Sequence, residues 1–221
     1  MNHFFLFWYT LFFMALSPIY SSAFANNQTR HIEGQAIVAK PEKGFYLEPF
    51  TEFGQSSPTD GDSPRPSYGF GLNLGWMQAS NLWTRLEPSF EIFSKSLNST
   101  RRNIIIPIGA SVKVAYAYRV GPNMYAGPAI GLGMGLASYQ ETRSEIKYES
   151  SSQVPVQTIS GQFLVDFIAG TGLSFRTGIK ASHYLMSVDE LEFESNTIKL
   201  DKSTHFNSVE IIIALRLKFP S

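Results

Sequence analysis

The sequence NSVEIIIALRLKF, residues 207–219, decides the fold of this 221-residue chain. Read at alternate positions, one side carries only apolar side chains: Val209, Ile211, Ile213, Leu215, Leu217 and Phe219. The other side carries Glu210, Ile212, Ala214, Arg216 and Lys218. Since successive side chains of a β-strand point to opposite faces, the segment is a strand with one apolar and one charge-bearing face. Its length suits a tilted strand that crosses a bilayer, which takes about 9 to 11 residues.

Such a strand needs partners, because an open sheet edge in lipid leaves backbone groups without hydrogen bonds, so the wall must close into a barrel. Seven further segments are candidate strands, and six of them repeat the two-residue period clearly. The seven are residues 44–54, 68–77, 82–92, 104–118, 124–137, 162–176 and 179–188. The two faces of the last one look alike, so its inward phase stays open.

The connections between these segments alternate in length. Four are long and polar, at residues 55–66, 94–102, 139–157 and 189–204. Three are short, at residues 78–81, at residues 119–123 and near Thr177 and Gly178. Bacterial outer-membrane barrels have an even number of strands, short periplasmic turns and long outer loops. The pattern therefore predicts an all-β, eight-stranded antiparallel up-and-down transmembrane β-barrel, located in the bacterial outer membrane, with both termini in the periplasm.

The first residues indicate export. An aromatic-rich apolar core at residues 4–16 precedes Ser21-Ser22-Ala23-Phe24-Ala25, whose Ala-x-Ala ending has the small residues that a signal peptidase accepts. We predict a signal peptide at residues 1–25, a periplasmic lead-in segment at 26–43 and the barrel at 44–221.

Composition narrows the function classes. Charged residues make up 16% of the chain, against roughly 25% in an ordinary soluble domain. The chain has no cysteine, which excludes disulfides and thiolate chemistry, and its formal net charge of zero gives no basic surface for nucleic acid. His31, His183 and His205 are scattered along the sequence, so we predict no metal cluster. No cofactor is predicted either.

Periodicity alone does not say which face is the lumen, because a soluble lipocalin-like barrel would bury its apolar face. In residues 124–137 the face opposite the apolar one is a row of small residues that includes Gly127, Gly131, Gly133 and Gly135. Glycines gain nothing from water and weaken a strand, but inside a narrow barrel they leave room for larger side chains. We therefore expect the apolar faces outside, with Ile104 and Ile106 of the fourth segment among them.

The charged side chains then face inward. An eight-stranded barrel is just wide enough for side chains to fill it, so mixed charges predict interior ion pairs and no wide channel. The predicted interior charge network comprises Glu48, Glu52, Arg85, Glu87, Glu91, Lys113, Asp166, Glu210, Arg216 and Lys218. Aromatic residues near the short turns predict an interfacial girdle, made of Trp76, Tyr116, Tyr118, Phe175 and Phe219.

With these features the chain resembles the small eight-stranded outer-membrane barrels of the OmpA/OmpX type. The resemblance covers nearly the whole mature chain, and it rests on the glycine-rich strand Tyr125-Ala126-Gly127-Pro128-Ala129-Ile130-Gly131-Leu132-Gly133 and on residues 211–219, which are similar to the family's insertion signal. Pro220 and Ser221 depart from the usual terminal aromatic residue. Members of such a family include structural proteins, adhesins and lipid-modifying enzymes, so the fold leaves the function open.

Our leading hypothesis is a non-enzymatic outer-membrane protein with a structural or surface-interaction role, an adhesin being one candidate. The alternatives are a soluble lipocalin-like binder and a lipid A-modifying enzyme. The enzyme family uses a His, a nearby Ser and a carboxylate at the outer rim; here Ser182, His183, Ser187, Asp189 and Glu190 lie at that end, but the family's His-x-Ser is absent. A Ser nucleophile needs its base within hydrogen-bond reach, and Ser182 points away from His183 on a strand.

The expected partners are outer-membrane lipids and lipopolysaccharide, with an extracellular ligand at the loops, no nucleic acid and a monomeric protein. The loop bases Lys95, Arg101 and Arg102 could contact lipopolysaccharide phosphates or form a merely solvated loop tip.

Overall fold

The computed structural model describes residues 43–59, 61–79, 83–143, 145–150, 152–170, 172–193 and 196–220. The predicted signal peptide and all but the last residue of the lead-in segment lie outside this part of the chain. The strands are β1 Gly44–Pro58, β2 Arg65–Ala79, β3 Thr84–Asn98, β4 Arg102–Gly121, β5 Met124–Arg143, β6 Ile146–Ser150, β7 Val154–Ile168, β8 Leu173–Phe193 and β9 Asn196–Pro220.

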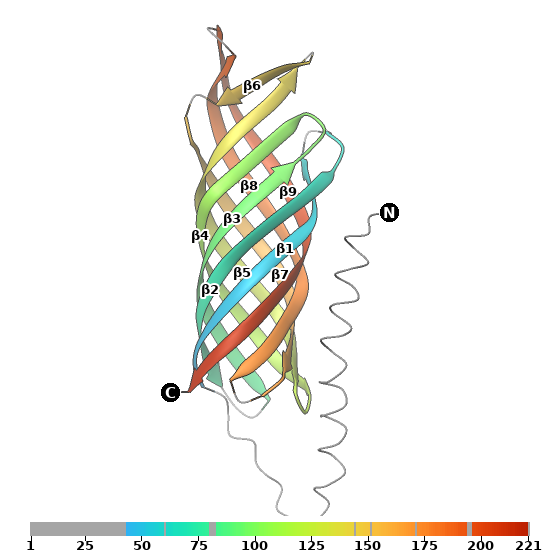
Figure 1. Cartoon of the computed structure of the whole chain (residues 1–221), viewed down its shortest axis with the longest axis vertical. Helices are drawn as coiled ribbons and strands as arrows, with labels where there is room; N and C mark the ends of the chain where they lie inside the picture. Colours follow the sequence, from blue (N-terminus) through green and yellow to red (C-terminus); the bar gives the residue numbers. More distant parts are fainter. Residues whose placement is uncertain are drawn as a thin grey trace, which may run out of the picture. The chain divides into compact units, whose positions relative to one another are not determined.

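Eight of these strands form a closed antiparallel barrel, and β6 is a short addition outside its main wall. Each wall strand pairs with the next, and β9 pairs with β1 from Gly44 opposite Pro220 to Pro58 opposite Phe206. Figure 1 shows this closure, with the blue β1 beside the red β9. Closure leaves no free edge in the wall, as a barrel in lipid requires. The predicted eight-stranded fold is confirmed.

The two ends of the barrel differ. The short connections after β2, β4 and β7 and the carboxyl end of β9 lie at one end, here named the turn end (Figure 1). The β8–β9 hairpin and β6 lie at the other, named the hairpin end. Short strand β6 pairs with β5 through Gln140 opposite Glu149 and with β8 through Ser150 opposite Leu191. Among the described residues, no helix is long and apolar enough to cross a membrane.

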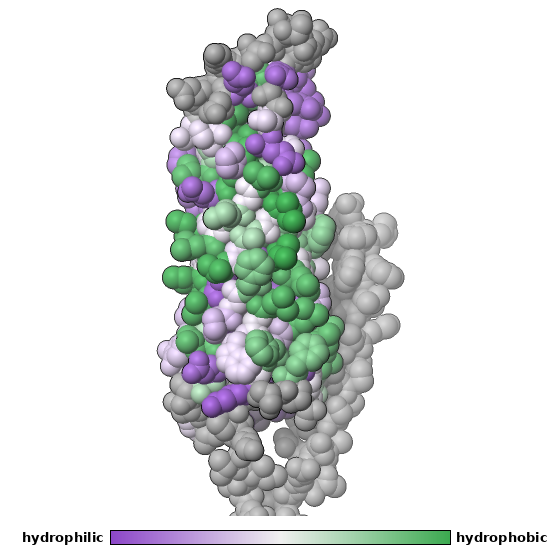
Figure 2. Space-filling view, turned by 90° about the vertical axis from the view of Figure 1, so that its left-hand side faces the viewer, coloured by the Kyte–Doolittle hydropathy of each residue, from purple (hydrophilic) through white to green (hydrophobic). Residues whose placement is uncertain are grey.

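The apolar faces lie outside and form a belt around the barrel, named the apolar belt. It includes Phe70, Leu74, Phe90, Val112, Ile130, Leu132, Met134, Phe163, Ile179, Val209, Ile211, Ile213, Leu215 and Leu217, all more than a third exposed. Figure 2 shows hydrophobic residues gathered along the middle of the wall, with hydrophilic ones toward both ends. A soluble barrel would bury this face, so the lipocalin-like alternative is wrong.

Three sequence predictions about the wall strands are wrong, two about their limits and one about which side chains face outward. No turn lies near Thr177 and Gly178: β7 ends at Ile168 and β8 begins at Leu173, so Phe175, Thr177 and Gly178 all belong to β8. The four predicted loops are largely strand, because the hydrogen-bond ladder continues beyond the belt with polar side chains: Ser56 of the first one lies opposite Ser208. The wall strands of 15 to 25 residues are therefore longer than a bilayer needs.

The third error concerns β4. Ile104 and Ile106 were predicted to face lipid, but both are fully buried inside the barrel, while Ile105 and Ile108 are exposed. The pairing of β4 with β5 shifts register between Ile105 and Ile108. A bulge of this kind adds one residue and so turns every later side chain to the opposite face.

Candidate functional site

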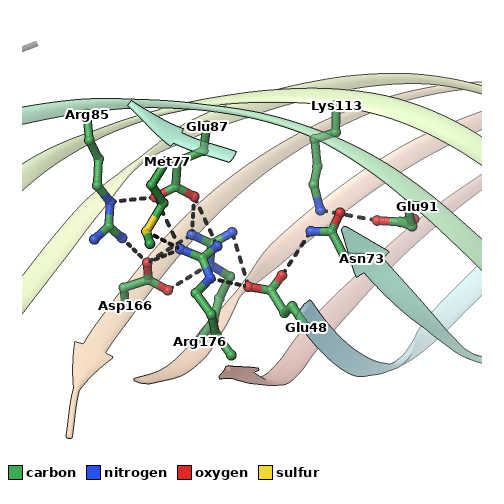
Figure 3. A network of polar contacts seen from close by, with 10 residues as sticks. Glu48, Asn73, Met77, Arg85, Glu87, Glu91, Lys113, Asp166 and Arg176 are labelled. Atoms are coloured by element: carbon green, nitrogen blue, oxygen red, sulfur yellow. Dashed lines mark hydrogen bonds and ion pairs between the residues drawn. The ribbon is translucent and has the colours of Figure 1, made fainter. Parts of the chain in front are cut away.

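The inward side chains near the turn end form a compact set of ion pairs, named the arginine tier. Its members are Glu48 of β1, Arg85 and Glu87 of β3, Asp166 of β7, Arg176 of β8 and Arg216 of β9. Figure 3 labels all of them except Arg216. All six are at most 3% exposed. Each cation contacts acids on other strands, so the tier ties distant parts of the wall together across the lumen.

Arg216 has the most central position in the arginine tier. Its Nε donates to Glu48 Oε2 at 2.7 Å, its Nη2 to Glu87 Oε2 at 3.0 Å and its Nη1 to Asp166 Oδ2 at 3.1 Å. Its Cζ lies 3.9 Å from the ring centroid of Tyr46, a cation–π contact. One guanidinium thus joins acids from three strands, which suits its planar set of five donors.

Arg176 and Arg85 complete the arginine tier. Arg176 Nε donates to Asp166 Oδ1 at 2.7 Å, and its Nη2 donates to Glu87 Oε2 at 2.5 Å. Arg85 forms ion pairs with Glu87 and Asp166, and its Cζ lies 4.0 Å from the ring centroid of Tyr125.

A second set, named the lysine tier, lies one level farther toward the hairpin end. Its members are Glu52 of β1, Glu91 and Lys95 of β3, Lys113 of β4, Lys180 of β8 and Glu210 of β9. Lys180 Nζ donates to Glu52 Oε1 at 2.7 Å and lies 3.5 Å from Glu91 Oε1. Lys113 Nζ donates to Glu91 Oε2 at 3.1 Å, and Lys95 pairs with both Glu52 and Glu210.

Each tier is electrically neutral. The arginine tier has three carboxylates and three guanidinium groups, and the lysine tier has three carboxylates and three ammonium groups. Between them Asn73, fully buried, donates from Nδ2 to Glu48 Oε1 at 3.1 Å (Figure 3). A buried charge is tolerated only when it is paired and hydrogen-bonded, so the balance is a condition for burying twelve charges in one lumen.

Between the lysine tier and the hairpin end, apolar side chains fill the lumen; they are named the apolar plug. It comprises Leu97, Ile104, Ile106, Ala137, Tyr139, Val154, Val156, Tyr184, Met186, Val188, Leu191 and Phe206, each at most 5% exposed. At this end, beyond the belt, Tyr139 Oη donates to Glu141 Oε2 at 2.9 Å. Burial raises the pKa of the Tyr139 hydroxyl, and the nearby Glu141 carboxylate raises it further.

Glycines in the wall leave space for interior aromatic rings. Tyr46 lies opposite Gly75, and a Cβ added to Gly75 would come within 2.2 Å of the Tyr46 ring. Phe50 lies opposite Gly71, and a Cβ added to Gly71 would come within 2.5 Å of the Phe50 ring. The sequence pointed to the glycines of residues 124–137 for this role, but these two rings use the glycines of β2 instead.

The structure places nine of the ten predicted network residues in the two tiers. The tenth, Lys218, is half-buried near the turn end. Sequence reasoning missed Arg176, Lys180 and Lys95. The sequence left open which face of β8 points into the barrel. Lys180, Ser182 and Tyr184 are buried, so the face that carries them is the inward one. Placing Lys95 on an outer loop was wrong, because β3 continues to Asn98 and directs this side chain into the lumen.

The five girdle residues all lie on the outer face toward the turn end. Tyr116, Tyr118 and Phe219 are exposed, and Trp76 and Phe175 are half-buried. Trp76 packs edge to face with Phe45 at 4.4 Å between ring centroids, and Tyr116 packs in the same way with Tyr118 at 4.9 Å. Their role at the lipid–water boundary is a proposal that rests on this placement.

Within the described part of the chain, the hydrogen-bonding neighbours of His183 are Asn207 and His205 and not a serine. Its Nδ1 lies 2.8 Å from Asn207 Oδ1, and its Nε2 lies 3.2 Å from Nδ1 of His205. Ser182 points into the barrel and is 5% exposed. The scatter of histidines along the sequence is thus misleading, because the β8–β9 pairing brings His183 and His205 together.

Comparison with known proteins bears on the fold. No protein-family model matches the chain, and no curated protein matches it by sequence. Among solved structures, Neisserial surface protein A is similar at a TM-score of 0.50 and 11% identity, over 80% of this chain and 97% of that one. The outer membrane protein OprG from Pseudomonas aeruginosa has a TM-score of 0.44 and 12% identity, over 84% of this chain and 100% of that one. Ail, the attachment invasion locus protein of Yersinia pestis, has a TM-score of 0.41 and 13% identity, over 78% of this chain and 99% of that one.

The likeness to Neisserial surface protein A concerns the fold, and it agrees with what the residues require. The wall is closed, its outer face carries an apolar belt, and its charges are paired inside. Lipid is the environment in which such a surface is stable. The chain is a small eight-stranded β-barrel of the bacterial outer membrane.

Proposed function

We propose that this barrel is a non-enzymatic surface protein, closed to solutes, which acts through the strands that it presents outside the membrane. The observation that carries the proposal is the filled interior. Two neutral tiers of ion pairs and the apolar plug occupy successive levels of the lumen. Opening a wide path would require these paired side chains and the apolar plug to leave the lumen, whose width in an eight-stranded barrel is just enough for side chains to fill.

The hairpin end provides a surface for interaction. On β9 the belt residue nearest this end is Val209, and the strand begins at Asn196, so about 40 Å of strand lies beyond the belt at ~3.3 Å per residue. Its partner β8 pairs with it up to Phe193 opposite Asn196. Because the hairpin is paired before a ligand binds, binding costs less conformational entropy of the protein than binding to a flexible loop would.

The lipid environment supplies the other partners. The apolar belt contacts outer-membrane lipids. We propose that Arg101, between β3 and β4, and Arg102, the first residue of β4, approach lipopolysaccharide phosphates. Closure of the sheet leaves no strand edge in the wall for a second copy, which supports a monomer.

Conductance tests the closed lumen. Purified mature protein is reconstituted into planar bilayers beside an open porin as positive control. We expect no steady channel steps from the barrel. Regular, concentration-dependent steps of porin size would contradict the proposal.

A display test addresses the surface role. Cells that display the wild type are compared, on a glycan array and on matrix-coated wells, with cells whose residues 189–201 are replaced by a two-residue Asn-Gly turn, which joins the paired residues Val188 and Lys202. We expect the shortened hairpin to lose retention while the heat-modifiable gel band persists. Equal retention of the two kinds of cell would show that the hairpin is not needed for binding.

The lipid-modifying alternative is tested separately. Lipid A from cells with wild type, with His183→Ala and without the protein is compared by mass spectrometry. We expect one mass profile in all three. A change present only with wild type would make the barrel an enzyme and overturn the non-enzymatic proposal.

A further inference from the structure

Two histidines from neighbouring strands lie side by side on the outer face of the barrel. In the β8–β9 pairing His183 lies opposite Asn207, and His205 lies opposite Leu185, two residues farther toward the hairpin end. Nε2 of His183 and Nδ1 of His205 are 3.2 Å apart, with ring centroids 5.3 Å apart and planes tilted by 35°. Both side chains are half-buried, so one side of the pair stays open to solvent.

Asn207 fixes the proton of His183. Its Oδ1 lies 2.8 Å from Nδ1 of His183 and can only accept a hydrogen bond. In the neutral ring Nδ1 therefore carries the proton, which leaves the lone pair of Nε2 directed toward His205. A histidine that ligates a metal commonly donates its other ring N–H to an oxygen in this way. Asn207 is thus placed as a positioning residue for a ligand nitrogen.

The separation of the two ring nitrogens fits one metal ion. Two imidazole nitrogens bound to Zn²⁺ at about 2.0 to 2.1 Å in tetrahedral geometry lie about 3.3 Å from each other. The observed 3.2 Å is close to this separation. Metal binding requires His205 to hold its proton on Nε2, so that its Nδ1 lone pair also faces the ion. Imidazole also suits Cu²⁺ and Ni²⁺.

We propose that His183 and His205 form a cross-strand site for a divalent transition-metal ion. Nε2 of His183 and Nδ1 of His205 are the ligands, Asn207 orients the first of them, and water completes the coordination. Within the described part of the chain, no group of three or more His, Asp or Glu side chains is arranged around a metal position. The site therefore binds more weakly than a structural zinc centre and exchanges its ion with the medium.

The site joins β8 to β9 just beyond the belt. Asn207 lies two residues from Val209, which is 60% exposed. A bound ion links the two strands at the base of the long hairpin. It binds the folded barrel only, because the two nitrogens meet only when the strands are paired, and such binding stabilises the fold.

Cu²⁺ and Zn²⁺ binding to untagged mature protein in detergent tests the proposal. Cu²⁺ bound to wild type is expected to show nitrogen superhyperfine coupling from two imidazoles in its electron paramagnetic resonance spectrum. His183→Gln and His205→Gln each should lower Cu²⁺ affinity at least tenfold and leave coupling to a single imidazole. Asn207→Ala should weaken binding severalfold and keep the two-nitrogen signature. His31→Gln is the matched control and should change neither.

Stability provides an independent readout. Zn²⁺ should raise the urea midpoint of wild type and of His31→Gln, and should leave that of His183→Gln/His205→Gln unchanged. A cold-versus-boiled gel shift shows that each variant is folded. Wild type that binds no Cu²⁺, or folded single variants that keep the wild-type affinity and spectrum, would overturn the site.

Discussion

Arg216→Met is the sharpest perturbation of the barrel interior. The guanidinium pairs with Glu48, Glu87 and Asp166 and has no exposed surface. Methionine keeps an unbranched apolar stem against Tyr46, so the substitution removes mainly the charge and its donors. The arginine tier is then left with three carboxylates and two cations.

The size of the effect follows from that imbalance. Removing one partner of a buried ion pair costs about 3 to 5 kcal/mol, because the remaining charge is left uncompensated. With a urea dependence of about 2 kcal/mol/M, the unfolding midpoint should fall by about 1.5 to 2.5 M. Lys147→Met removes an exposed charge on β6, and such surface changes stay within about 0.5 kcal/mol.

The assay is a urea titration of each variant in the same detergent or vesicles, with the folded fraction read from the band that migrates differently without boiling. Arg216→Met/Glu48→Gln removes one charge of each sign and restores neutrality, while the amide oxygen of Gln still accepts from Asn73. We expect this double variant to recover at least half of the lost stability. A shift below 0.3 M for Arg216→Met (roughly 0.6 kcal/mol), or a double variant less stable than the single one, would refute the reasoning.

Three further predictions concern other parts of the chain. Gly75→Ala should cost about 1 to 3 kcal/mol in the same titration, because its Cβ meets a buried tyrosine ring, whereas Gly161→Ala, with nothing within 4 Å, should cost less than about 0.5 kcal/mol. Intact-mass analysis of the exported protein should give an amino terminus at Asn26; a retained leader would disprove cleavage there. Because the pKa of Tyr139 is raised in the folded barrel, stability should fall as pH rises above the ordinary tyrosine value of about 10, and Tyr139→Phe should flatten that fall.

The part of the wall that lies in the bilayer could be predicted well from the sequence. Lipid accepts only apolar side chains, so the two-residue period from Val209 to Phe219 shows directly which side faces out. Beyond the belt this constraint ends. There Ile104 and Ile106 face inward because a register shift separates this end of β4 from the belt, and no periodic signal marks the change of phase. The polar composition of residues 189–204 suggests a loop, although most of them pair in a hairpin.

The acids of the interior could be predicted, but their sorting into two tiers could not. Which cation meets which acid depends on the stagger of the strands around the closed wall. Lys180 reaches Glu52 across 128 positions of sequence, and no local pattern encodes that distance. The histidine pair has the same origin, since the register of β8 on β9 places His183 beside His205.

The neutral tiers also constrain how a lineage of this barrel can change. A belt residue can be exchanged alone, because the membrane accepts many apolar side chains, so outer positions drift quickly and retain little record of ancestry. A substitution that removes the charge of an acid such as Glu52 is tolerated only when its partner Lys180 is substituted as well. Descendants should therefore differ at these interior positions in matched pairs, and those paired exchanges would reveal kinship after the rest of the sequence has lost it.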